Sequence, residues 1–190
     1  EFQNRTTNKE ILYKTEDNLG FVNNFFSLID KDIKADYFML ADQDDIWCSE
    51  KTSRSLTYLK SQDLAHPALY CGRTQLIDMY DKFKGKSRLF KKRPGFRNAL
   101  VQSIAGGNTM AMNKAAKAIV QQTIPYSKDV VSHDWWIYIV ITAYSGHVYY
   151  DPMPSLLYRQ HPQNLIGSNI GVRAKLQRLK LLTSGGFKEW

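Results

Sequence analysis

Continuous apolar runs alternate along the chain with segments of helical periodicity, and this pattern predicts the order of its elements. Strands are expected at residues 11–14, 37–41, 68–71, 109–112, 148–150 and 155–159. Helices are expected at residues 21–29, 96–102, 114–122, 133–145 and 171–182, and a further helix would follow a cap at Ser49. Strands and helices in alternation indicate an α/β layer architecture.

The strand expected at residues 37–41 stands out because its apolar run is unbroken and acids flank it. Such a run is typical of a strand whose two faces are both buried. Asp42, Asp44 and Asp45 follow it directly. Since ligands bind beyond the carboxyl ends of strands in open α/β sheets, this placement predicts a binding site.

The chemistry of this acidic segment favours a cation. Two carboxylates about 4 Å apart repel each other by roughly 4 kcal/mol at an effective dielectric constant near 20. A cation relieves that repulsion, and carboxylate oxygens suit Mg²⁺ or Mn²⁺. The alternative interpretation is an ordinary turn in which an aspartate caps the following helix.

Composition and charge narrow the class of protein. The chain has 190 residues, 43% of them hydrophobic, which is enough for one folded domain with a core. Its formal net charge of +8 favours an anionic partner, such as a nucleotide, a nucleic acid or an anionic lipid surface. Half of its 26 basic residues lie in two acid-free stretches, residues 82–97 and 173–188. The second stretch predicts a basic amphipathic helix, either on a membrane surface or as a solvated face over a core-packing stripe.

The remaining residues set the expected compartment. Cys48 and Cys71 are not spaced as a metal or redox pair, so a reducing cytoplasm is expected. Residues 1–14 lack the apolar core of a secretory signal. The most apolar run, residues 135–144, is about half of the roughly 20 residues that a membrane-spanning helix needs. We therefore expect a cytoplasmic protein.

Five sequence blocks, taken in order, resemble bacterial family 2 glycosyltransferases of the GT-A type, in their rhamnosyltransferase-like branch. The blocks are Asn-Leu-Gly-Phe with Asn-Phe within residues 18–25, Tyr-Phe-Met-Leu-Ala-Asp-Gln-Asp-Asp-Ile-Trp at 37–47, Gly-Gly-Asn-Thr-Met-Ala-Met-Asn at 106–113, Ser-His-Asp-Trp-Trp at 132–136, and Leu-Tyr-Arg-Gln-His at 157–161. The resemblance extends over residues 18–167. It implies a three-layer α/β/α sandwich with a mostly parallel central sheet in residues 1–170, followed by a basic tail at 171–190.

The resemblance also implies a reaction. Relatives of this kind transfer a sugar from a nucleotide-sugar with inversion, and they depend on a divalent metal. The expected donor is dTDP-L-rhamnose or a UDP-hexose. The expected acceptor is a saccharide or a lipid-linked saccharide of cell-surface polysaccharide synthesis, handled at the inner face of the membrane.

The site residues follow from the matched positions, while His133 stands where many relatives have glutamate. The resemblance implies Asp42, Asp44 and His161 as ligands of Mn²⁺ or Mg²⁺, Asp42, Asp45 and Arg159 as donor and diphosphate contacts, Asp134 as the general base, and Gly107, Asn108, Trp135 and Trp136 as acceptor contacts.

Several of these residues also have a structural interpretation. Asp134 could favour the N-terminus of its helix through the helix dipole, and His161 could be an ordinary turn residue. Trp135 and Trp136 could stack on a sugar, or one of them could join the core. Arg159 could reach the diphosphate or only brace its loop.

The strands that hold the nucleotide base in relatives are not visible before Asn18. We therefore expect an N-terminally truncated domain with an open sheet edge, which a second copy could cover by pairing or swapping. A non-catalytic remnant is one alternative to an active enzyme. A basic nucleic-acid-binding protein or metal-dependent nuclease is another, but no nucleic-acid-binding signature accompanies the basic residues.

Overall fold

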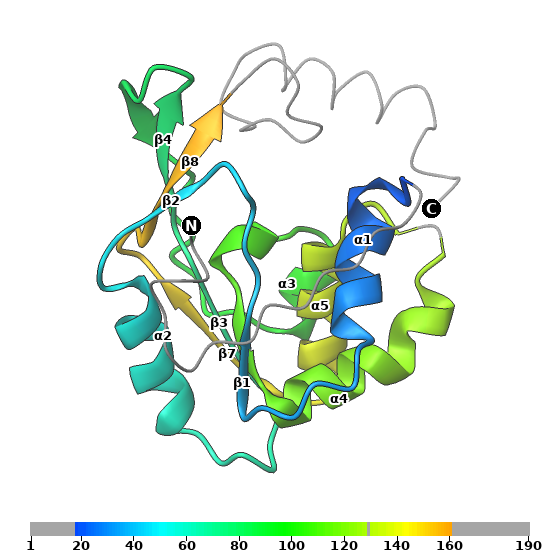
Figure 1. Ribbon diagram of the computed structural model, residues 1–190. Helices are drawn as coiled ribbons and strands as arrows, with labels where there is room; N and C mark the ends of the chain where they lie inside the picture. Colours follow the sequence, from blue (N-terminus) through cyan, green and yellow to red (C-terminus); the bar gives the residue numbers. More distant parts are fainter. Residues whose placement is uncertain (1–17, 129, 161–190) are drawn as a thin grey trace, which may run out of the picture.

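The computed structural model describes residues 18–128 and 130–160, which form a mixed α/β fold with two four-stranded sheets (Figure 1). The helices are α1 (Gly20–Ile29), α2 (Lys51–Lys60), α3 (Phe96–Ala99), α4 (Lys114–Thr123) and α5 (His133–Ala143), with the short 3₁₀ helices η2 (Gly107–Thr109) and η3 (Ile124–Tyr126). The strands are β1 (Tyr37–Met39), β2 (Ile46–Trp47), β3 (Ala68–Gly72), β4 (Gln75–Asp78), β5 (Phe83–Lys86), β6 (Ala111–Asn113), β7 (His147–Asp151) and β8 (Leu156–Gln160). The predicted α/β class is confirmed.

The first sheet has the strand order β1-β6-β3-β7. β3 and β7 are parallel, whereas β6 is antiparallel to both of its neighbours. The last residue of β6, Asn113, lies opposite the first residue of β1, Tyr37. α4 starts directly after Asn113, at this end of the sheet. Among the described residues the first sheet is therefore mixed, because β1, β3 and β7 run in one direction and β6 runs in the other. The expected three-layer sandwich with a mostly parallel sheet stays a prediction.

Alternate residues of β3 belong to different parts of the core, because successive side chains of a strand point to opposite faces. Leu69 and Cys71 join the large apolar cluster that includes residues of α1, α4 and α5. Ala68 and Tyr70 face the other way and pack with Leu59 of α2. Helices thus cover both faces of the first sheet, which explains why β3 is buried along its whole length.

A buried asparagine fixes the junction between β6 and α4. The Asn113 side chain caps α4 by accepting a hydrogen bond from the amide of Ala116, and it also accepts one from the amide of Ala68. Its amide group donates to the carbonyl of His66. One side chain therefore joins the start of β3 to the end of β6, and both strands are held in register.

The second sheet, with the order β2-β8-β4-β5, continues from the first (Figure 1). The parallel pair β3–β7 leads into the parallel pair β4–β8, and β5 folds back on β4 as a hairpin. The sequence pattern predicted β8 but missed β2, β4 and β5. β2 has only two residues, and β5 lies inside the basic stretch, where lysines replace the apolar alternation.

Three local predictions need correction. β1 is only partly buried along its length, because it is an outer strand of the sheet that the structure describes. Ser49 does not cap α2, since its hydroxyl donates to the Glu50 carboxylate and Glu50 precedes the helix. α3 is a single turn, shorter than the helix expected at residues 96–102.

Two predicted elements lie outside the residues that the structure describes. The strand expected at residues 11–14 and the helix expected at 171–182 are not among the described residues. Within residues 18–128 and 130–160, no helix has the length and apolar character to span a bilayer. Cys48 and Cys71 are both free thiols.

Candidate functional site

The acidic segment lies where the two sheets meet. Asp42, Asp44 and Asp45 occupy the connection between β1 of the first sheet and β2 of the second. The chain stays attached to the first sheet just before the acids, because the Leu40 amide donates to the carbonyl of Met110 at 3.1 Å. The carboxylates therefore lie beyond the carboxyl end of β1, as the sequence predicts.

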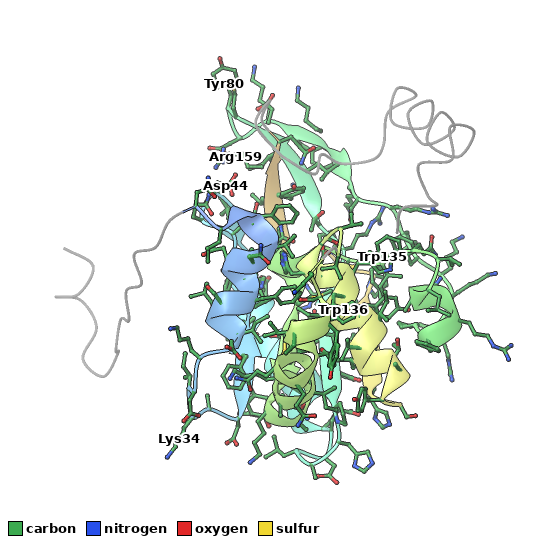
Figure 2. All side chains as sticks on the ribbon, turned by 90° about the vertical axis from the view of Figure 1, so that its right-hand side faces the viewer. Lys34, Asp44, Tyr80, Trp135, Trp136 and Arg159 are labelled. Atoms are coloured by element: carbon green, nitrogen blue, oxygen red, sulfur yellow. The ribbon has the colours of Figure 1, made fainter. Side chains whose placement is uncertain are left out.

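Arg159 braces this segment from β8. β2 and β8 pair antiparallel with Ile46 opposite Leu157, and this register brings Arg159 beside Asp44 and Asp45. The Arg159 Nε donates to the carbonyl of Asp44 at 3.0 Å, and its amide donates to the Asp45 carboxylate at 3.2 Å. Figure 2 shows Arg159 directly above Asp44. Of the two roles considered for Arg159, these contacts support the bracing of the loop.

The glycine-rich segment at η2 connects the acids to α5. Asn108 is buried and its side-chain amide donates to the Asp45 carboxylate. The Gly107 amide donates to the Asp134 carboxylate at 3.2 Å. Adjacent residues of one segment thus contact two carboxylates that are far apart in the sequence, and Asn108 has a protein partner at the position where an acceptor contact was predicted.

The electrostatics show that the carboxylates form one group. The pKa of Asp42 is raised to about 6 by burial and by the negative charges of Asp45, Asp44 and Asp134. Burial also raises the pKa of Asp45, an effect that the Asn108 hydrogen bond opposes. Asp134 therefore lies close enough to the acidic segment to influence it, and the fold brings the predicted base toward the predicted metal ligands.

His133 is buried beside this group, and neither of its ring nitrogens has a hydrogen-bond partner among residues 18–128 and 130–160. Its ring stacks on Phe25 of α1 with the centroids 3.9 Å apart. A Cβ on Gly107 would come within 2.2 Å of the His133 Nε2, so only glycine fits there. Burial lowers the pKa of His133, which keeps the imidazole neutral. The neutral His133 ring therefore fills the space between Phe25 and Gly107.

Lys51 is a second buried group at the site, and the sequence reasoning missed it. Its side chain is 1% exposed, and its ammonium lies 3.8 Å from the centre of the Trp47 ring. Burial lowers the pKa of Lys51 to about 8, while the negative charge of Asp45 acts in the opposite direction. The sequence could have indicated this, because Lys51 begins the helix that follows the acidic segment, and a positive charge at that place can interact with the acids.

The two tryptophans take different positions. The Trp135 indole N–H donates to the carbonyl of Ala99 at 2.6 Å, which ties α5 to the end of α3. Trp136 packs against the main core and its indole N–H donates to Thr123 at 3.3 Å. Figure 2 shows both tryptophans well below Asp44 and Arg159. These contacts give each indole a structural role. The predicted contact of each tryptophan with an acceptor stays a prediction.

The predicted metal ligands fit a divalent metal only in part. Burial and the negative charges of Asp45, Asp44 and Asp134 raise the pKa of Asp42, and a cation such as Mg²⁺ or Mn²⁺ would offset those charges. Among residues 18–128 and 130–160, however, no three His, Cys, Asp or Glu side chains are grouped to hold a metal ion. His161, the third predicted ligand, lies outside the described residues. The described carboxylates fit a metal that takes its other ligands from elsewhere, such as a diphosphate.

Comparison with known proteins supports the rhamnosyltransferase-like part of the resemblance. The chain is similar to the dTDP-rhamnosyl transferase RfbG of Shigella flexneri, with 28% identity over 178 residues. The match covers 90% of this chain and 59% of that relative, so the chain spans less than two thirds of the relative's length. No model of a known protein family matches the chain. Over most of its length, this chain is therefore similar to a part of a rhamnosyl transferase.

Proposed function

We propose that this chain is the catalytic part of a glycosyltransferase that transfers a sugar, with inversion, from a nucleotide-sugar to a saccharide acceptor. The observation that carries the proposal is that the adjacent residues Gly107 and Asn108 donate hydrogen bonds to Asp134 and Asp45, which brings the predicted base beside the acidic segment. The similarity to a dTDP-rhamnosyl transferase favours dTDP-rhamnose as the donor. Synthesis of a cell-surface polysaccharide would be the setting.

On the donor side, Asp42 and Asp44 would hold Mn²⁺ or Mg²⁺, which supplies positive charge to the departing diphosphate when bound. The raised pKa of Asp42 supports this assignment, because it arises from burial and from neighbouring negative charges, and a nearby cation would offset those charges. Arg159 fixes the peptide of Asp44 and the carboxylate of Asp45. It would therefore set the geometry of the donor site more than it would bind the diphosphate.

On the acceptor side, Asp134 would take the proton from the attacking hydroxyl. Its carboxylate accepts hydrogen bonds from the amides of Gly107 at 3.2 Å and Trp135 at 2.6 Å, which hold it in one orientation. A single base with no nucleophile from the protein gives one displacement and hence inversion at the anomeric carbon. Gly107, Asn108 and Trp135 would line the approach of the acceptor.

Thermal unfolding tests the donor site directly. With Mn²⁺ and dTDP-rhamnose at about a hundred times the dissociation constant, we expect stabilisation by about 2.7 kcal/mol, or a rise of about 5–10 °C in Tm. UDP-glucose serves as the competing donor. Asp44→Ala should abolish the rise, and Asp134→Asn should keep it, because the base acts on the acceptor.

The matched control is Asp32→Ala, which removes an exposed acid just after α1. This variant should respond like the parent chain. A cooperative transition without a shift for either nucleotide-sugar would overturn the donor site and favour a folded, non-catalytic remnant. An equal shift in Asp44→Ala would show that the nucleotide binds elsewhere.

A further inference from the structure

The β4–β5 hairpin ends in a cluster of exposed apolar side chains. Met79, Tyr80 and Phe83 are 57%, 72% and 59% exposed. The hairpin projects away from the first sheet (Figure 1), and Figure 2 shows Tyr80 at its outer end. Exposed apolar residues are ordinary when scattered, but three at one projecting turn form a surface that water solvates poorly.

The same hairpin carries three lysines, and the charges of two of them are not cancelled by an ion pair with the described residues. Lys82, Lys84 and Lys86 are all exposed. The two acids of the turn already have partners, since Asp78 pairs with Lys84 at 3.0 Å and Asp81 pairs with Arg159 at 2.6 Å. Lys82 and Lys86 form no ion pair with the residues that the structure describes. The turn therefore presents apolar groups together with net positive charge.

Apolar and aromatic side chains flanked by lysines match the chemistry of an anionic bilayer surface. The apolar groups enter the boundary between headgroups and acyl chains, while the cations remain with the acidic headgroups. Soluble polyanions satisfy only the charges and leave the apolar groups exposed. We propose that the tip of this hairpin, residues 79–86, docks on an anionic lipid bilayer.

The position of Arg159 gives this docking a consequence for the candidate site. Its Nη1 binds the Asp81 carboxylate of the hairpin turn, while its Nε binds the carbonyl of Asp44. The hairpin tip is thus fixed beside the carboxylates. If the proposed function holds, docking brings the site to the surface that carries a lipid-linked acceptor, but bilayer binding itself does not depend on sugar transfer.

Vesicle co-sedimentation of the full chain tests the proposal without any assay of activity. The vesicles contain phosphatidylcholine alone or with phosphatidylglycerol, and a soluble DNA oligonucleotide serves as the polyanion. We expect binding to the anionic vesicles. A Met79→Ser, Tyr80→Ser, Phe83→Ser variant should bind them about tenfold more weakly, because less apolar area enters the bilayer. Replacing Lys82, Lys84 and Lys86 by Gln should weaken binding about tenfold or more.

The matched control replaces Met153, Tyr126 and Tyr144 by Ser, at sites that are 63%, 78% and 55% exposed on other elements. It should bind like the parent chain, and thermal melts of all variants should verify their folding. No binding to anionic vesicles, or an equal loss in the control, would overturn the proposal. Binding to the oligonucleotide that only the Lys→Gln variant loses, without vesicle binding, would assign the basic surface to a soluble polyanion.

Discussion

The two sheets of this molecule are stabilised by different interactions. In the first sheet β3 and β6 are fully buried, and apolar side chains fill both faces. In the second sheet β2 is exposed and β5 nearly so. The middle of this sheet is nevertheless buried and apolar, at Leu76, Ile77 and Leu156. At its outer edge charged contacts join Arg159 to Asp81 and Lys84 to Asp78. The carboxylates lie between the two, so a rigid apolar sheet supports one side of the site and polar contacts shape the other.

This difference has a physical meaning. Burial of apolar area supplies most of the free energy of folding, whereas exposed ion pairs contribute about 0–1 kcal/mol each. Changes at the buried positions of the first sheet should therefore alter global stability, whereas changes at the exposed β4–β5 hairpin of the second sheet should alter local geometry and binding. The following variants test that division.

The largest effect is expected in the first sheet. Leu69→Ala removes a fully buried side chain of β3 and should lower the free energy of unfolding by about 3 kcal/mol, as measured by urea denaturation. The counterpart in the second sheet, Phe83→Ala on β5, should change it by less than about 0.5 kcal/mol. Similar losses of unfolding free energy in both variants would contradict the division between the buried first sheet and the exposed hairpin of the second.

The next effect lies at the junction. Gly107→Ala places a Cβ about 2.2 Å from the His133 Nε2, and relief of this overlap must displace a ring stacked on Phe25. We expect a loss of about 1–3 kcal/mol, measured by thermal unfolding. Gly95→Ala is the matched control, because a Cβ there has nothing within 4 Å. If the two variants proved equally stable, the His133 ring would not be packed tightly between Phe25 and Gly107.

A stabilising effect is expected from Asp42→Asn in the absence of metal. The folded state raises the pKa of Asp42 from 3.8 to about 6, so this group favours folding at low pH and loses that contribution as pH rises through that window. Because the side chain is partly exposed, we expect only about 1 kcal/mol of added stability at pH 7.5. Melts from pH 3.5 to 7.5 should show a smaller decline in the variant than in the parent chain. An identical pH profile would argue against the repulsion.

The smallest effect on stability is expected from Arg159→Met. In its ion pair with Asp81 the carboxylate is 64% exposed and solvent screens the pair, so the loss should be about 1 kcal/mol or less. Hydrogen exchange should instead accelerate at the turn between β4 and β5, and the response to nucleotide-sugar should weaken. Arg97→Met, at an exposed arginine of α3, should change neither. Unchanged exchange at the turn would show that other contacts hold the hairpin.

The predicted elements succeeded where the apolar pattern was strong. α1, α4, α5, β3 and β7 were all found close to their observed bounds, because their burial in the first sheet requires a regular pattern. The missed strands β2, β4 and β5 all belong to the second sheet, and they are short, with two residues in β2 and four each in β4 and β5. The antiparallel course of β6 was also missed, since local periodicity carries no information about strand direction.

The sequence by itself determined the α/β class, the acidic segment after β1 and the matched blocks, because periodicity and motif order are local properties of the chain. Only the tertiary structure decided that Asp134 approaches Asp42, that Asn108 binds Asp45, and that Arg159 joins the acids to the hairpin. It also revealed the buried Lys51. These contacts link residues far apart in sequence, and their geometry depends on strand pairing and on the desolvation that packing imposes.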